Sequence, residues 1–252
     1  MTIRRAVALI HAKTDLVGSL PDALLELGIT LDVVCIEGAL PDPETLELLF
    51  VMGSIDAAYD DSLPWLQKEI TWLRQVIDRG VPVLGICFGS QLLARVLGGG
   101  VARNHTPEIG WCHIETPTDD WVHAGPWLNF HFDAFTAPPT AALLGRTELA
   151  QQVFRQERVM GVQFHPEITP AMFDTWTASW RQTEEGRSFL QEVGDLPERL
   201  RREIELRQPE NRANLKRMLQ DFLHSLGEPC VVTERGNAQL SVKQQADTRE
   251  AK

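Results

Sequence analysis

Residues 81–99 read VPVLGICFGSQLLARVLGG, an apolar run that passes directly into a segment with helical spacing. The first six residues are typical of a strand that is buried on both faces, and the helical pattern continues to the glycines at 98–100. Cys87 therefore falls at a strand-to-helix junction, with Gly85 and Gly89 two residues away on either side. An α/β enzyme can place a nucleophile at such a junction, because the glycines leave room for a sharp turn.

The preceding eighty residues alternate between short apolar runs and amphipathic segments. Expected helices cover residues 20–27 and 65–77 and end at Gly28 and Gly80, and the expected strands cover residues 6–10, 31–36, 48–51 and 81–86. This βαβα order predicts an α/β fold with a mostly parallel sheet flanked by helices.

The pattern changes after residue 100. Short extended pieces predict antiparallel strands added to the sheet at 111–115, 129–132, 150–154 and 159–164, followed by a helix at 170–180. From about Thr183 the chain is strongly charged and predicts two helical segments interrupted at Pro209, with a solvated face. We expect a catalytic domain over residues 1–182, a charged helical extension over 183–233 and a disordered tail over 234–252.

Composition narrows the class of protein. The 252 residues are 43% hydrophobic and 23% charged, as in ordinary folded proteins, and the net charge of -11 argues against binding to nucleic acid or an anionic membrane. No apolar run approaches the roughly 20 residues of a membrane helix. The four cysteines form no C-x-x-C pair or disulfide framework, which predicts a cytoplasmic protein. Small molecules or proteins are the expected partners.

A second candidate segment is VMGVQFHPE, residues 159–167, in which an apolar run ends at His165 and Glu167. In an extended backbone, His165 and Glu167 would point to the same side, so the carboxylate could hold the imidazole. The strand before His165 would share a sheet with the strand before Cys87, which brings the two side chains together. A lone His-x-Glu is more often a surface pair, and a lone cysteine is more often a packing residue. The combination predicts a triad of Cys87, His165 and Glu167.

The two segments GICFGSQ at 85–91 and GVQFHPE at 161–167 resemble the signature motifs of the class I, or triad-type, glutamine amidotransferases. The resemblance covers about residues 6–180, and it is strongest to free-standing domains similar to the glutaminase half of GMP synthetase. It implies a flavodoxin-like fold and an enzyme that needs no cofactor. It also implies that Cys87 attacks the glutamine amide to form a thioester, that His165 transfers protons and that Glu167 orients His165.

The resemblance assigns further residues to the site. Phe88 would supply an oxyanion-hole amide, and Gln91 would lie near the substrate. The second oxyanion donor of the family comes from a G-G-P loop, where this chain has Met52-Gly53-Ser54, so Gly53 is the candidate although the first glycine and the proline are replaced. His131 and Asp133 stand where relatives carry W-H-x-D or S-H-x-D, and they are expected to line the pocket.

Several alternatives stay open. The substrate is either glutamine, with ammonia passed to a separate synthetase subunit, or a γ-glutamyl peptide or conjugate that the same triad hydrolyses or transfers. A catalytically silent binding protein is a third reading, favoured only by the altered loop at Gly53. A metal site is not expected, because the spacing of the candidate ligands fits no compact motif; these candidates are His105, His113, His123, His131 and Asp133.

Overall fold

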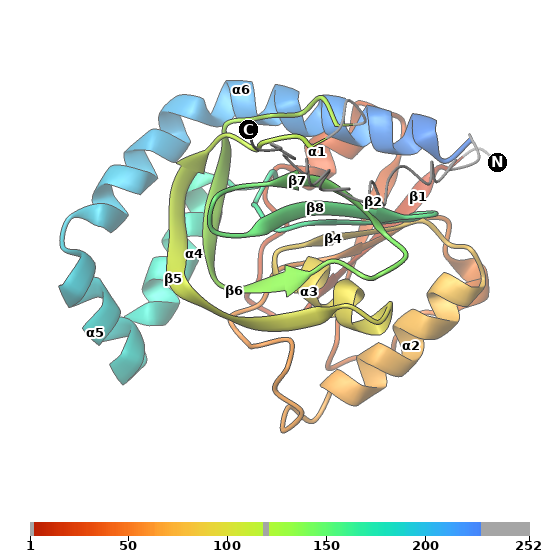
Figure 1. Cartoon of the computed structure of the whole chain (residues 1–252), viewed down its shortest axis with the longest axis horizontal. Coiled ribbons are helices and arrows are strands. Elements are labelled where there is room, and N and C mark those ends of the chain that lie inside the picture. The colour runs from red at the N-terminus through yellow and green to blue at the C-terminus, as the bar shows by residue number, and fades with distance from the viewer. Residues whose placement is uncertain (1–2, 118–120, 228–252) are drawn as a thin grey trace, which may run out of the picture.

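The computed structural model describes residues 3–117 and 121–227, and its centre is a seven-stranded sheet (Figure 1). The strand order is β2-β1-β3-β4-β9-β8-β7, in which β1, β2, β3, β4 and β9 run parallel and β8 is antiparallel to both of its neighbours. The strands are β1 Arg5–Ile10, β2 Thr30–Cys35, β3 Leu49–Val51, β4 Val83–Ile86, β7 Ala142–Arg146, β8 Gln151–Gln156 and β9 Val159–Val162. The predicted mostly parallel α/β sheet is therefore confirmed.

Helices cover both faces of this sheet. One face packs against α1 (Leu20–Leu25) and α6 (Leu196–Ser225), and the other packs against α2 (Leu66–Asp78) and α3 (Phe88–Val96). Because side chains alternate along a strand, Phe50 of β3 faces the first pair of helices, whereas Leu49 and Val51 face the second pair. In Figure 1, α6 runs along the upper side beside α1, and α2 lies on the opposite side.

The remaining elements surround one end of the sheet. A long antiparallel pair, β5 (Gly100–Cys112) and β6 (Trp127–Thr136), forms a separate two-stranded sheet. Helices α4 (Pro170–Trp180) and α5 (Glu184–Val193) pack with the first half of α6 over β6 in an aromatic-rich cluster. A short 3-10 helix, Pro43–Thr45, precedes β3. None of the helices in the described ranges is long and apolar enough to cross a membrane.

The expectation of antiparallel additions after residue 100 was partly wrong. Strand β9 is parallel to β4, with Val83 opposite Val159 and Ile86 opposite Val162. All four of its residues are buried, which is typical of a parallel strand covered on both faces. Of the piece expected at 111–115, only Trp111 and Cys112 belong to β5, which pairs with β6 outside the main sheet. Strand β7 was not anticipated.

The expected interruption at Pro209 was also wrong, because α6 is one helix of 30 residues that continues through this proline. A proline inside a helix costs about 3 kcal/mol. Full burial of each large apolar side chain contributes about 1.5–3 kcal/mol, so a few such contacts outweigh that cost. Leu200 and Ile204 before Pro209, and Leu215 and Met218 after it, are all buried. One face of α6 is therefore packed rather than solvated, whereas the tail at 234–252 lies outside the described residues.

Candidate active site

Cys87 lies directly between β4 and α3 in a strained backbone conformation. Its φ of 51° and ψ of -110° fall in a region that L residues rarely adopt, and such strain persists only where the surroundings enforce it. The Cys87 N–H donates to Val162 O of β9 at 2.8 Å. A Cβ on Gly89 would lie 2.0 Å from Val51 O, so glycine is required for this turn to approach the sheet.

His165 follows β9, the neighbour of β4, and is held by Glu167. The Nδ1 atom of His165 lies 2.9 Å from Oε1 of Glu167, with the imidazole 4% exposed and the carboxylate fully buried. A carboxylate only accepts hydrogen bonds, so Nδ1–H is the donor and Nε2 is left for other contacts. The carbonyl oxygen of Glu167 accepts from Ser19 N–H at 2.8 Å, which anchors the segment to the start of α1.

The contact between His165 and Glu167 forms in a turn and not in an extended segment. Residues 166–167 are a turn, with Ile168 N–H 3.5 Å from the carbonyl oxygen of His165. Residues 165–167 therefore lack the predicted side-chain alternation of an extended segment, although His165 and Glu167 do meet. The structure brings them to the same edge of the sheet as Cys87, because both β4 and β9 end there.

Electrostatic interactions favour a protonated imidazole at His165. Burial alone would lower the pKa of His165, but the charges of Cys87 and Glu167 and its hydrogen bonds to both side chains raise the pKa from 6.5 to about 10. The arrangement thus favours an imidazolium at His165 beside the sulfur of Cys87. Such a pair provides a nucleophile together with a proton for a leaving group.

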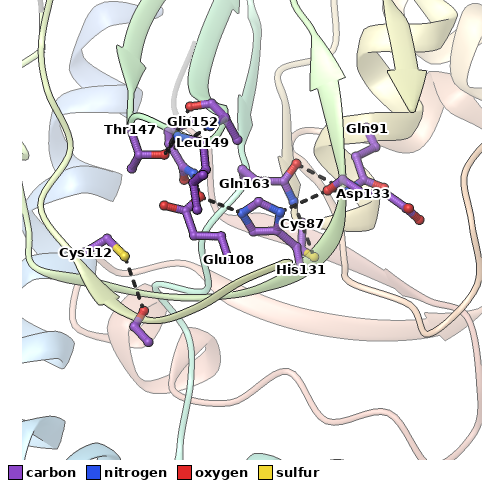
Figure 2. Close-up of polar contacts among 12 residues, drawn as sticks. Cys87, Gln91, Glu108, Cys112, His131, Asp133, Thr147, Leu149, Gln152 and Gln163 are labelled. Atoms are coloured by element: carbon purple, nitrogen blue, oxygen red, sulfur yellow. Dashed lines mark hydrogen bonds and ion pairs between the residues drawn. The ribbon is translucent and has the colours of Figure 1, made fainter. Parts of the chain in front are cut away.

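Two glutamines complete a polar chain next to the sulfur (Figure 2). The side-chain amide of Gln163 donates to Cys87 Sγ at 3.6 Å, and its oxygen lies 3.3 Å from Nε2 of Gln91. Gln91 also donates to the backbone oxygen of Asp133 at 2.8 Å. Gln163 was missed in the sequence, although it lies within the same motif as His165 and only two residues before it.

His131 and Asp133 both line the pocket, but their polar atoms are engaged within the protein. The ring of His131 contacts Glu108 Oε2 at 3.1 Å and the backbone oxygen of Asp133 at 3.0 Å, as Figure 2 shows. The carboxylate of Asp133 accepts from Tyr59 at 3.2 Å and lies 3.5 Å from the Arg103 guanidinium. His131 therefore forms a fixed part of the wall.

The two candidate oxyanion donors lie on either side of Cys87. Phe88 is the first residue of α3, and the first N–H groups of a helix have no intrahelical partner. Gly53 follows β3, and a Cβ built on it would lie 3.2 Å from His165 Cε1 and 3.8 Å from Cys87 Cβ. Gly53 thus lies beside both Cys87 and the imidazole of His165.

One cavity of about 220 Å³ is lined by Cys87 and His165 together with both candidate oxyanion residues. Aromatic side chains form part of its wall, and the ring of Trp176 lies 4.7 Å from that of His165. Charged side chains form another part, including Asp15, Asp56 and Arg103. Within the described ranges, no group of three or more His, Cys, Asp or Glu side chains is arranged to hold a metal ion.

Comparison with known proteins identifies a common family. A family model described as glutamine amidotransferase class-I matches residues 8–178. A GMP synthase (glutamine-hydrolyzing) of Tropheryma whipplei is 32% identical over 136 residues, covering 51% of this chain and 26% of that protein. The enzyme of the same description from Aeropyrum pernix is 37% identical over 156 residues, covering 52% of this chain and 30% of that protein. The chain thus spans less than a third of these curated relatives.

Solved structures show the same fold. A glutamine amidotransferase of Thermotoga maritima has a TM-score of 0.78 at 24% identity, covering 89% of this chain and 100% of that one. A glutamine amidotransferase of Methylobacillus flagellatus has a TM-score of 0.76 at 21% identity, covering 96% of this chain and 100% of that one. This likeness covers a larger share of the chain than the family match does.

Proposed function

Since the chain belongs to the class I glutamine amidotransferase family, we propose that it hydrolyses the side-chain amide of glutamine with Cys87, His165 and Glu167. The observation that carries the proposal is the buried 2.9 Å hydrogen bond between His165 and Glu167, beside a cysteine in a strained strand-to-helix turn. Nucleophile, base and orienting group then have the arrangement of a catalytic triad.

The first half of the reaction forms a thioester. The Cys87 thiolate attacks the amide carbon, and the carbonyl oxygen becomes an oxyanion that accepts from the Phe88 and Gly53 amides. When the tetrahedral intermediate collapses, the C–N bond breaks and the His165 imidazolium gives its proton to the leaving nitrogen. Ammonia leaves, and a glutamyl thioester remains on Cys87 beside a neutral imidazole.

The second half returns the enzyme to its starting state. The neutral His165 takes a proton from water, whose oxygen attacks the thioester carbon. Collapse of this intermediate breaks the C–S bond and releases glutamate, which restores thiolate and imidazolium. Glu167 keeps its hydrogen bond to Nδ1 throughout, so the same Nε2 atom serves as acid and then as base.

The proposal extends to the use of the ammonia. The curated relatives that match are described as glutamine-hydrolyzing GMP synthases, and the chain spans only 26% and 30% of two of them. Because these relatives are described both as GMP synthases and as glutamine-hydrolyzing, we propose that a synthetase partner accepts the ammonia. Copurification with such a partner, and a glutamine-dependent amination that requires both proteins, would support this extension.

A second candidate substrate is favoured by the wall of the cavity. Trp176 packs against His165, and Met172 and Trp180 line the same cavity. Because His165 would protonate the leaving nitrogen, apolar groups beside it could accommodate a substituent on that nitrogen. This arrangement fits a γ-glutamyl peptide or conjugate, which would be cleaved through the same thioester.

The first prediction tests the nucleophile. We expect Cys87→Ala to remain folded and to lose at least about a thousandfold in glutamate release, because the covalent intermediate cannot form. Glutamine and a series of γ-glutamyl amides should be compared by coupled glutamate assay. The faster substrate in kcat/KM decides between the two candidates.

A matched control is available in Cys112→Ala, which also removes a partly buried thiol. Burial, together with the charge of Glu108, raises the pKa of Cys112 to about 11, so this thiol stays protonated and unreactive at neutral pH. We expect the Cys112→Ala variant to keep its activity. Glutamate release at the wild-type rate by Cys87→Ala would refute the proposed function.

A further inference from the structure

His11 lies directly after β1 and has two buried polar partners. Its imidazole is 1% exposed, with Nδ1 at 3.3 Å from the carbonyl oxygen of Gly53 and Nε2 at 3.2 Å from Oε1 of Glu69. Glu69, in α2, is fully buried. The proposed reaction gives neither His11 nor Glu69 a role, yet a buried charged pair is costly unless its geometry is well satisfied.

The contacts fix the position of one proton of this pair and favour a charged His11. A peptide oxygen only accepts hydrogen bonds, so Nδ1 of His11 carries a proton toward Gly53. The carboxyl group of Glu69 shares the hydrogen bond with Nε2 on the other side of the ring. Burial opposes the charge on His11, but the hydrogen bonds and the negative charge of Glu69 prevail and raise the pKa of His11. Both ring nitrogens of His11 thus have a buried oxygen partner, and Nδ1–H donates to Gly53.

The same ring also contacts the other side of the oxyanion site. Its centroid lies 4.6 Å from that of Phe88 in an edge-on arrangement, and 5.2 Å from that of Trp65. Phe88 begins α3 and carries one of the two candidate oxyanion amides. His11 therefore touches both residues whose N–H groups would face the developing negative charge.

We propose that His11, held by Glu69, is a positioning residue that fixes the Gly53 loop for oxyanion binding; this inference rests on the proposed function. Gly53 has neither a Cβ nor a neighbouring proline to restrict it, because Met52 and Ser54 flank it. A hydrogen bond to its carbonyl oxygen from a buried ring limits the rotation of its peptide groups. An amide held in place beforehand stabilises an oxyanion without reorganisation during the reaction.

The test removes both members of the pair together. The double variant His11→Phe/Glu69→Leu leaves no unpaired buried charge and keeps a ring against Phe88, so it should fold. We expect kcat for glutamate release from glutamine to fall by about tenfold to a hundredfold, with KM within about twofold, because a misplaced donor affects the transition state. Thermal unfolding should be measured on the same samples.

A second double variant separates positioning from packing. His11→Asn/Glu69→Gln places a side-chain N–H near the former Nδ1 but gives up the ring, so it should pack less well against Phe88. We expect it to lose less kcat than His11→Phe/Glu69→Leu despite lower thermal stability. A role in packing alone predicts the reverse order. Alkylation of Cys87 by iodoacetamide forms no oxyanion, and its rate should be similar in both variants and in the wild type.

The outcomes distinguish this inference from the proposed function. Suppose that the wild type turns over glutamine and that the folded His11→Phe/Glu69→Leu variant has a kcat within twofold of the wild-type value. This result would overturn the positioning role of His11 but not the proposed function. The reversed order of the two double variants would overturn it as well. A wild-type protein that is alkylated at Cys87, yet releases no glutamate from glutamine or γ-glutamyl amides, would overturn the proposed function and this inference with it.

Discussion

Cys87 helps to stabilise the charged form of His165, and this effect can be measured. We predict that Cys87→Ala lowers the pKa of His165 from about 10, because the thiolate charge is lost while the effect of burial remains. Titration of the imidazole by ¹H–¹⁵N NMR spectroscopy checks this. His123 is an internal control, since burial lowers its pKa and the substitution should not change it. A His165 that still titrates near 10 in Cys87→Ala would contradict the coupling.

The same coupling predicts a pH dependence of stability. The pKa of His165 in the folded protein lies above its ordinary value of 6.5, so the folded state holds this proton more tightly. Its contribution to the free energy of unfolding is fully present below pH 6.5 and is lost as the pH rises through about 10. The melting temperature of the wild type relative to Cys87→Ala should therefore fall over that interval.

Some residues of the candidate site can be predicted from the sequence alone, whereas others cannot. Cys87 and His165 each stand at the end of an apolar run, so local pattern makes them candidates, and their combination in one sheet selects them as a pair. His11 and Glu69 lie 58 positions apart, and their contact depends on the packing of α2 against the end of β1. Gln163 could have been selected from its place beside His165, but its contact with sulfur depends on the pairing of β4 with β9.

At the scale of elements, α6 reaches the candidate site through one side chain. The amide of Asn211 is buried and donates to the carbonyl oxygen of Pro166 at 2.8 Å, between His165 and Glu167. We predict that Asn211→Leu destabilises the protein by about 1–3 kcal/mol, because a buried carbonyl loses its donor. Loosening of the turn should lower kcat by on the order of tenfold.

Asn214 provides the matched control for this prediction. It lies three residues farther along α6, is also buried, and its side chain contacts Arg217 of the same helix. Asn214→Leu should therefore change stability without lowering the kcat of the folded enzyme. Equal loss of kcat in the two variants, measured well below their melting temperatures, would show that Asn211 acts only through general packing.

Element boundaries in the first hundred residues were predicted well, and those after residue 100 less well. The early strands and helices follow each other in sequence, so their local period identifies them. Whether β9 runs parallel to β4 depends on a partner 76 positions away, and the short run at 159–162 is compatible with either direction. The continuity of α6 at Pro209 likewise depends on burial of both halves, which local propensity does not include.

For the whole molecule, α6 completes the cover of one sheet face and is packed into the same core as α1 and β1. We predict that Leu219→Ala, which truncates a side chain that is 1% exposed, lowers the free energy of unfolding by about 2–5 kcal/mol. Leu206→Ala removes the same atoms from a position on α6 that is 81% exposed, and it should change stability by at most about 0.5 kcal/mol. Urea unfolding gives both values.

Urea unfolding of Leu219→Ala and the wild type also shows whether the helical extension and the sheet unfold together. If α6 belongs to one cooperative unit, tryptophan fluorescence, far-UV circular dichroism and loss of glutamate release should follow a single transition that shifts to lower urea in Leu219→Ala. An extension that folds independently would instead give two transitions, with activity unaffected by the first. Asn211 and Leu219 lie on the same helix. If that helix unfolds only together with the sheet, the buried contacts of Leu219 also keep Asn211 hydrogen-bonded to the turn between His165 and Glu167.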